Sequence, residues 1–348
     1  MTALGEVILT LRRARGLTQV ELAARAGVTQ AALSRYEQDL RHPDDETLEA
    51  LAAALGVTQR FLSTAGRERG AMAIDAHMRR RATAKATDWR MLEARLNELR
   101  FHARQLFEEV SLRSSDLVPT FDPLETTPSD AARMVRMQWK LPSGPVRRLL
   151  AWLEAAGCLV VQEPFPTRRV DGLSQWIGDH PVLLLNSSAP LDRLRLTAAH
   201  ELGHLCLHAN GPGDDVEREA NEFAAEFLMP AAVIESQLRH LSIGDLMDLK
   251  RQWGVSVQAL IERAHALGTL RPADRTSLYK QLSAKGWRTR EPGSDEIAPE
   301  ETRLTTAIAD SLHQRGLDDD EVALVAGFAS ADTNHVFVGS HVRPLRAL

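Results

Sequence analysis

Residues 200–204 read His-Glu-Leu-Gly-His, and they combine two metal ligands with a general base in five positions. On a helix, residues four apart lie on one face, about one turn apart, so His200 and His204 can bind one metal ion together. Glu201 lies beside the first ligand, where its carboxylate can take a proton from the attacking water. The simplest alternative is a helix that carries two surface histidines by chance.

A third ligand is needed, because catalytic zinc usually binds three protein groups and keeps a fourth position open for water. Residues 216–230 place their apolar side chains on one helical stripe and end at a proline. Glu217 and Asn221 are four apart on this predicted helix, so Glu217 is predicted to complete the metal site and Asn221 to orient a ligand histidine. The other carboxylates of this helix are Glu219, a reserve ligand, and Glu222 and Glu226, which are expected on a solvated face.

His208 and Cys206 also lie close to the motif. On one continuous helix His208 is about 12 Å along the axis from His200, at about 1.5 Å per residue. Because a zinc–nitrogen bond is only about 2 Å long, the three histidines cannot share one ion. His208 is therefore predicted to be a surface histidine or one that orients a ligand, and Cys206 to be a core residue.

These residues carry a family resemblance. His-Glu-Leu-Gly-His, followed by Glu217-x-x-x-Asn221-x-Phe-Ala-Ala-Glu-Phe-Leu-Met-Pro, resembles the ImmA/IrrE family of zinc metallopeptidases over roughly residues 130–270. The resemblance implies a gluzincin-like site in which Zn²⁺ takes its third ligand from a glutamate on the next helix. It also implies cleavage of a protein substrate, often a repressor or anti-regulator. The family often has Asp where this chain has Asn221, a departure that would weaken the orientation of a ligand histidine.

The first sixty residues contain a second pattern, which predicts a helix, a tight turn and another helix. Thr18 caps the first helix with Glu21 three residues later, Gly27 ends that helix, and Thr29 caps the next one. This pattern resembles Xre/Cro-type helix-turn-helix domains over about residues 4–62, and the resemblance implies that the second helix enters the DNA major groove. The simplest alternative is a helix-turn-helix retained for protein contact.

Seven residues are candidates for contact with a double-stranded DNA operator. Gln30 and Arg35 are predicted to read base edges, because Gln pairs well with adenine and Arg with guanine. The remaining candidates lie on the same surface or contact phosphates: Gln19, Thr29, Ala31, Ser34 and Arg41. Residues 1–65 carry seven basic and eight acidic residues. Nonspecific affinity should therefore be modest, and a homodimer is expected to supply the missing strength.

The composition indicates an intracellular protein of two or three domains. The 348 residues include 42 basic and 47 acidic residues, for a formal net charge of −5. The two cysteines, Cys158 and Cys206, predict no disulfide framework. The sequence contains no signal-peptide pattern and no apolar run that approaches a membrane span, so the cytoplasm is the expected location and no membrane partner is expected.

The predicted fold is mainly α with a small α+β domain. An N-terminal helix-turn-helix bundle (1–65) is followed by a helical connector (66–115), a zinc-peptidase domain (116–270) and a C-terminal helical region (271–348). The connector contains basic residues at 79–81 and at Lys85, and its default interpretation is a solvated linker helix. Docking on the peptidase, pairing with a second subunit and phosphate contact are the alternatives.

The peptidase domain is predicted to contain a short, mostly antiparallel sheet. Strand-like runs lie at 158–162, 172–177 and 182–186. The last of these immediately precedes the metal-binding helix. It is therefore expected to be an edge strand, to which a peptide substrate adds itself by backbone pairing.

Residues 316–328 repeat residues 16–28 in one ungapped register, with both glycines, the leucine, the glutamate and two alanines identical. A second, degenerate helix-turn-helix unit is therefore predicted around 302–338, with chance similarity as the alternative. Its aspartates at 318–320 and Asp332 would repel phosphates, so this unit is expected to contact protein. Residues 290–301 are predicted to be a flexible linker before it.

These features predict a DNA-binding regulator fused to a zinc endopeptidase that cleaves a regulatory protein or its own chain. The family resemblance places this activity in stress or mobile-element control. Two other interpretations compete with it. One is a non-catalytic transcription factor whose peptidase-like domain serves as a sensor or dimerisation module, and the other is an antitoxin that pairs with a toxin.

Overall fold

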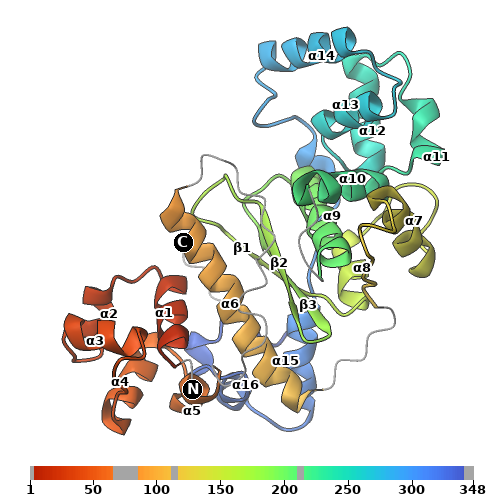
Figure 1. The fold of residues 1–348 in the computed structure, drawn as a ribbon. Helices are drawn as coiled ribbons and strands as arrows, with labels where there is room; N and C mark the ends of the chain where they lie inside the picture. Colours follow the sequence, from red (N-terminus) through yellow and green to blue (C-terminus); the bar gives the residue numbers. More distant parts are fainter. Residues whose placement is uncertain (1–3, 66–84, 111–116, 210–214, 341–348) are drawn as a thin grey trace. The chain divides into compact units, whose positions relative to one another are not determined.

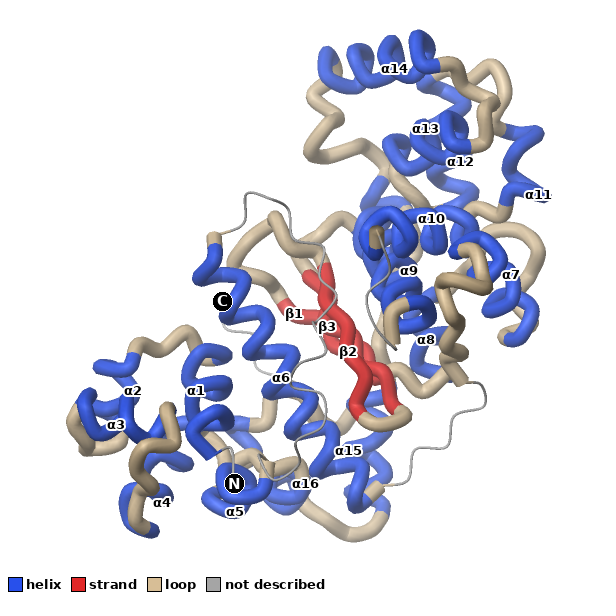
Figure 2. Tube along the Cα trace, in the orientation of Figure 1, coloured by secondary structure: helices blue, strands red, loops and turns tan. Residues whose placement is uncertain are grey.

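The computed structural model describes residues 4–65, 85–110, 117–209 and 215–340, and it is mainly helical with one small sheet (Figure 1, Figure 2). This confirms the predicted fold class. Two compact units are present: unit 1 lies within Met1–Ala76, Arg80–Arg113 and Arg303–Leu348, and unit 2 within Ser114–Thr302. The predicted connector and the end of the chain thus both contribute to unit 1. Among the described residues, no helix is both long and apolar enough to cross a membrane.

Unit 1 begins with a five-helix bundle whose helix ends follow the sequence signals. The helices are α1 (Leu4–Ala14), α2 (Gln19–Arg25), α3 (Gln30–Glu37), α4 (Asp45–Leu55) and α5 (Gln59–Thr64). Thr18 and Glu21 form a reciprocal capping box on α2, and the Thr29 hydroxyl accepts a hydrogen bond from Ala32 N at the start of α3. These caps satisfy backbone N–H groups that a helix leaves unpaired, so they fix where α2 and α3 begin.

Helix α6 (Ala86–Glu109) packs in unit 1, and the expectation of a solvated linker helix is wrong. It lies against α1, and one of its faces is buried through Leu92, Leu96, Leu99 and Leu106. Burial of an apolar stripe of this length stabilises the helix far more than its intrinsic propensity does. The basic residues at 79–81 lie outside the described residues, and Lys85 is exposed.

The C-terminal repeat also belongs to unit 1. Helices α15 (Leu304–Gln314) and α16 (Asp319–Val325) are joined by a short turn, and Asp318 and Glu321 form the same capping box on α16 that Thr18 and Glu21 form on α2. The first repeat is followed by α3, whereas the second is followed only by a 3-10 turn, η3 (Ala331–Thr333). The second repeat therefore reproduces α1 and α2 without a helix that corresponds to α3.

A buried histidine of α6 connects the C-terminal repeat to α5. The His102 ring of α6 stacks between Phe61 and Phe328, with centroid separations of 4.3 and 3.8 Å. Its Nδ1 lies 2.7 Å from the carbonyl oxygen of Ala326. At Gly327 (φ 88°) an added Cβ would lie 2.2 Å from the Phe61 ring, so only glycine allows this approach. The repeat predicted to contact protein thus contacts the N-terminal helices of its own chain.

A buried charge cluster lies beside this stack. Arg15 forms an ion pair with Glu98 at 2.7 Å, and His102 Nε2 lies 3.8 Å from the same carboxylate. Burial alone would raise the pKa of Glu98, but the interactions with His102 and Arg15 outweigh it and lower the pKa to about 2. Glu98 therefore stays ionised wherever the protein is folded near neutral pH.

Replacing Phe328 by Ala is expected to destabilise unit 1 by about 3–5 kcal/mol, because the ring is fully buried and its loss leaves a cavity beside His102. Hydrogen exchange of α5 and α6 in the full-length protein would report the change as lost protection. Leu324→Ala is the matched control, since Leu324 in the same repeat is 48% exposed. Equal protection of α5 and α6 in both variants would show that the C-terminal repeat does not stabilise the bundle.

Unit 2 contains a three-stranded sheet. Its helices are α7 (Pro128–Gln138), α8 (Leu149–Ala155), α9 (Leu191–Leu207), α10 (Val216–Leu228), α11 (Ala231–Ile234), α12 (Ile243–Trp253), α13 (Val257–Ala266) and α14 (Pro272–Ala284), with 3-10 turns η1 (Glu235–Gln237) and η2 (Ser294–Glu296). The strands are β1 (Leu159–Glu163), β2 (Gly172–Ile177) and β3 (His180–Asn186).

The order of the strands corrects one prediction. The order is β1-β3-β2, with β1 and β3 parallel and β2 and β3 antiparallel, so the sheet is mixed rather than mostly antiparallel. The strand predicted at the edge, β3, lies in the centre. Its continuous buried run over 181–186 fits a strand that pairs on both sides. The edge strand next to α9 is β2, which packs against that helix.

Residues 290–301 are anchored, and the prediction of a flexible linker is wrong for them. The buried Glu291 accepts backbone hydrogen bonds from Val257 and Gln258 at the start of α13, and Lys250 donates to it at 2.9 Å. The buried Glu300 accepts from Leu149 and Leu150 at the start of α8, each at 3.0 Å, and pairs with Arg195 of α9. Each glutamate thus caps a helix distant in sequence, a role that local composition does not reveal.

Candidate metal centre and nucleic-acid interface

Helices α9 and α10 carry the predicted metal ligands and pack closely against each other. Their approach depends on Gly203, between the two histidines: an added Cβ would lie 3.1 Å from Phe223 and 3.2 Å from Ala220 Cα. A larger residue would push α10 away. The glycine therefore holds Glu217, on the first turn of α10, near the histidines of α9.

The three predicted ligands meet. One donor atom from each of His200, His204 and Glu217 lies within 4.8 Å of the others. The two Nε2 atoms are 3.0 Å apart, and the Glu217 carboxylate oxygens lie 3.6 Å from His200 Nε2 and 3.4 Å from His204 Nε2. Donors at about 2.0–2.1 Å from a tetrahedral zinc ion are about 3.3 Å apart, so this donor set fits Zn²⁺.

The histidines are buried and the glutamate is half-exposed, which leaves the centre open on one side. His200 and His204 are 0% and 1% exposed, whereas the Glu217 side chain is 42% exposed. Asn221 Oδ1 lies 3.1 Å from His200 Nδ1, as predicted for an orienting residue. An amide oxygen accepts, so Nδ1 carries the proton and the Nε2 lone pair of His200 faces the other ligands.

His208 is fully buried, so its prediction as a surface histidine is wrong and the orienting alternative agrees with its position. Its Nδ1 lies 3.0 Å from His204 Nδ1, and its Nε2 lies 2.9 Å from Glu219 Oε2. Glu219, the reserve ligand, thus points to His208 rather than to the Nε2 pair. His208 lies at the end of α9 and Glu219 near the start of α10. Their contact is a tertiary contact, which helix periodicity within one segment does not predict.

Glu201 is buried, and the strand β2 orients it. Ser174 Oγ donates a 2.7 Å hydrogen bond to Glu201 Oε2. Sequence reasoning missed Ser174. The available signal was weak: it is a polar residue in an otherwise apolar first half of the strand. Cys206, predicted to be a core residue, is buried, and burial raises the pKa of its thiol, so it remains protonated.

The expectation that Glu222 and Glu226 lie on a solvated face holds only in part. Glu222 is half-buried and accepts a 2.9 Å hydrogen bond from Ser129. Glu226 is 2% exposed and forms ion pairs with Arg133 of α7 and Arg263 of α13. Helices from two other parts of the chain cover this end of α10, so a residue that follows the solvated pattern becomes buried.

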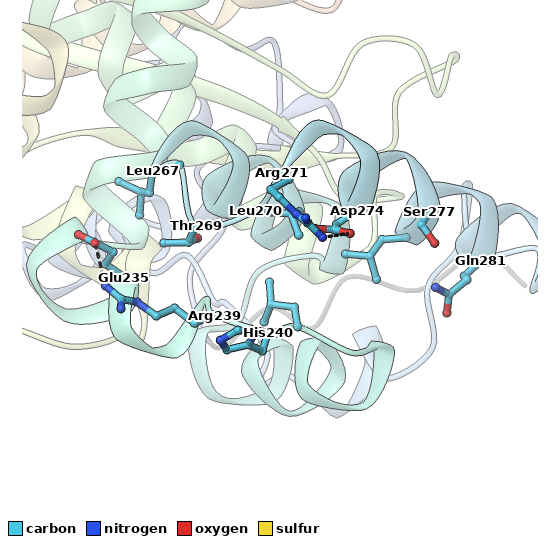
Figure 3. A pocket seen from close by; sticks show the side chains of 13 residues that line it. Glu235, Arg239, His240, Leu267, Thr269, Leu270, Arg271, Asp274, Ser277 and Gln281 are labelled. Carbon is cyan, nitrogen blue, oxygen red and sulfur yellow. Dashed lines mark hydrogen bonds and ion pairs between the residues drawn. The ribbon is translucent and has the colours of Figure 1, made fainter.

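A separate hollow of ≈ 820 Å³ lies in unit 2, away from the metal ligands. It is lined by residues of α14 and of the segments around residues 235–241 and 267–271 (Figure 3). Its charged side chains pair with each other, Arg239 with Glu235 at 3.6 Å and Arg271 with Asp274 at 2.7 Å, and all four are well exposed. These pairs leave little net charge to attract a charged ligand.

In unit 1, a chain of hydrogen bonds fixes the start of the predicted recognition helix. Arg12 forms a buried ion pair with Glu37, which accepts from Gln19 Nε2 at 2.7 Å. Gln19 Oε1 in turn accepts from Gln30 Nε2 at 2.7 Å. Gln30 is exposed at the first position of α3, so its amide is held in place by a buried charge pair. The network therefore fixes the orientation of the Gln30 amide at this end of α3.

The other predicted DNA contacts differ in exposure. Ala31 and Arg35 are exposed on α3, and Arg41 is exposed just beyond it, 5.9 Å above the Tyr36 ring. Ser34 is half-buried and accepts a hydrogen bond from Gln38. The Thr29 hydroxyl caps α3. Of the seven predicted contacts, Gln30, Ala31 and Arg35 are therefore the exposed residues of α3.

Comparison with known proteins agrees with both halves of this description. Residues 8–60 match the helix-turn-helix family, and residues 153–265 match the family described as IrrE N-terminal-like domain. Over 60 residues the chain is 47% identical to an uncharacterised HTH-type transcriptional regulator, y4dJ, of Sinorhizobium fredii, covering 17% of this chain and 78% of that protein. The chain belongs to the helix-turn-helix regulators. It joins their domain to an IrrE/ImmA-like peptidase domain.

A second relative matches a shorter part of the chain. The immunity repressor protein of Bacillus phage phi105 is 43% identical over 53 residues, which cover 15% of this chain and 37% of the repressor. The chain thus spans little more than a third of that repressor's length.

Proposed function

We propose that this protein is a DNA-binding regulator whose second domain is a zinc-dependent endopeptidase. The observation that supports this most directly is the convergence of His200, His204 and Glu217, at separations that suit tetrahedral zinc, beside the buried carboxylate of Glu201. A chance pair of surface histidines would be neither buried nor joined by a third ligand from another helix.

In this proposal His200 and His204 bind zinc through Nε2, and Glu217 binds it through its carboxylate. Bound zinc would lower the pKa of a water molecule and polarise the scissile carbonyl group. Asn221 holds His200 in the tautomer that presents Nε2. The half-exposed side of the site, at Glu217, leaves room for a substrate to approach.

Glu201 is the proposed general base and acid. Its carboxylate would receive the proton of the attacking water and then deliver it to the leaving amine, and the hydrogen bond from Ser174 to Oε2 fixes its orientation. Because this carboxylate is buried, its proton transfers take place with little competing solvent.

The proposed substrate is an extended segment of a protein, with β2 as the strand on which it docks. β2 is an edge of the sheet, packs against α9, and carries the Ser174 that orients Glu201. A peptide that pairs with its backbone would run past the catalytic carboxylate. A regulatory protein or this chain itself is the proposed target, because the peptidase domain is fused to a regulator.

The test of this proposal is digestion of a mixed peptide library by the zinc-loaded protein, with products read by mass spectrometry. Cleavage is expected with zinc and should disappear when a chelator removes it and return when zinc is restored. Two negative results together would contradict the endopeptidase proposal. The zinc-loaded protein would leave both the library and its own chain intact, and cells that produce it would contain no new cleavage products.

The protein is proposed to bind a DNA operator as a homodimer, in which Gln30 and Arg35 read base edges. Arg35→Ala is expected to weaken specific binding by about 1–3 kcal/mol and to relax specificity at one base position. Binding to a selected operator and to its single-base variants would measure both effects. The control is Arg60→Ala, at an exposed position of α5 away from α3. Unchanged operator preference in the Arg35 variant would exclude base reading by this residue.

A further inference from the structure

Three buried side chains in unit 2 form a hydrogen-bonded row that ends at a proposed metal ligand. His204 Nδ1 lies 3.0 Å from His208 Nδ1, and His208 Nε2 lies 2.9 Å from Glu219 Oε2. His204, His208 and Glu219 are 1%, 0% and 8% exposed. We propose that His208 and Glu219 are positioning residues for His204, an inference that rests on the zinc site proposed above.

The proton positions along this row follow from chemistry. A metal ligand must offer a lone pair, so His204 presents Nε2 to zinc and carries its proton on Nδ1. His208 must then accept a hydrogen bond from that N–H at its own Nδ1 and carry its proton on Nε2. The Nε2–H group of His208 donates a hydrogen bond to the carboxylate of Glu219. With zinc on His204 Nε2, each donor in the row faces an acceptor in this arrangement, and Glu219 supports the tautomer of His204 through His208.

The same row explains why Glu219 is not itself a ligand. Its Oε2 is held by His208, and its Oε1 lies 3.6 Å from Arg218. Glu217, two residues earlier, faces the Nε2 pair instead. Two carboxylates from one turn of α10 therefore act on the proposed metal site in different ways. Glu217 acts directly, and Glu219 acts through His208.

The two proposed histidine ligands are oriented by chemically different groups. His200 faces the neutral amide of Asn221, whereas His204 is connected to a carboxylate. A carboxylate partner makes an imidazole a better ligand than a neutral partner does, because it stabilises positive charge on the ring. The negative charge of Glu219 thus acts on the proposed metal site through His204.

The row is held by rigid elements at both ends. His208 is the C-cap residue of α9, and its backbone N–H donates to His204 O at 2.9 Å. Glu219 lies in the first turns of α10, with its N–H bonded to Asp215 O at 3.0 Å. Because α9 and α10 pack at Gly203, the side chains are held in register by the helices rather than by a loop.

The test measures zinc affinity of the full-length protein by competition with a chelating dye. His208→Ala and Glu219→Ala are each expected to weaken binding about 10–100-fold, the usual cost of losing a group that orients a ligand. If Glu219 acts through His208, the double variant should bind zinc about as well as His208→Ala alone. His208→Gln should retain much of the affinity, because its amide can accept from His204 and donate to Glu219.

Glu222→Ala, on the same helix, is the matched control and should bind zinc as wild type does. The absorption spectrum of the cobalt-substituted protein gives an independent readout, which should shift in His208→Ala and not in the control. Single variants with wild-type affinity, or losses that multiply in the double variant, would overturn the inference while leaving the zinc site intact. A wild-type protein that binds no zinc would overturn the proposed function as well.

Discussion

Replacing Glu201 by Gln is expected to reduce peptide cleavage by about 10²–10⁴-fold, the usual contribution of a general base, while zinc remains bound. The amide has the shape of the carboxylate and can still accept the hydrogen bond from Ser174, so the buried site should keep its geometry. It cannot take a proton from water. Digestion of the peptide library and zinc content, measured on the same preparation, would check both parts of the prediction.

The control for this variant is Glu222→Gln on α10, which makes the same chemical change outside the proposed site. It is expected to cleave at the wild-type rate. If Glu201→Gln also cleaved at the wild-type rate, with its zinc retained, another group would have to be the base. If the variant lost zinc, a structural role for Glu201 would be indicated instead.

Replacing Glu217 by Ala is expected to weaken zinc binding, because a direct ligand is removed. The loss should exceed the factor of about 10–100 that is usual when only a group that orients a ligand is lost. The backbone of α10 should be unaffected, since the side chain is half-exposed and lies in the first turn of the helix. Zinc affinity by dye competition measures the effect. Loss of zinc should abolish cleavage, so both readouts are expected to fall together.

Glu222→Ala, one helical turn and a residue further along α10, serves as the control and should keep wild-type affinity. This pair of variants also separates the competing functional classes. A protein that binds no zinc, and in which Glu217→Ala changes nothing, would favour the non-catalytic transcription factor or the antitoxin. Loss of zinc binding and of cleavage in Glu217→Ala, but not in Glu222→Ala, would favour the enzyme.

Features that depend on short spacing along one helix were predictable from the sequence. His200 and His204 share a face, Glu217 and Asn221 are four apart on the next helix, and the structure brings all four side chains to one place. The caps of α2 and α3 were predictable for the same reason: Thr18 and Thr29 act on backbone groups within three residues.

Features that depend on contacts between distant segments were not predictable. The burial of His208 requires α10, and the burial of Glu226 requires α7 and α13. Glu291 and Glu300 occur in a polar, proline-containing stretch, yet each caps a helix more than 30 residues away. The pairing of β1 with β3 rather than with its neighbour β2 likewise joins segments that are separate along the chain, and the residue spacing within each run does not give it.

The most direct test of the central claim compares new protein N-termini in cells that produce wild type or Glu201→Gln at equal levels. The two proteins should bind zinc equally and differ in the ability to cleave. A defined set of new N-termini, from a regulatory protein or from this chain, is expected with wild type and should be absent with Glu201→Gln. Identical sets of N-termini in the two strains, with wild type containing zinc, would contradict the claim that this site is a peptidase.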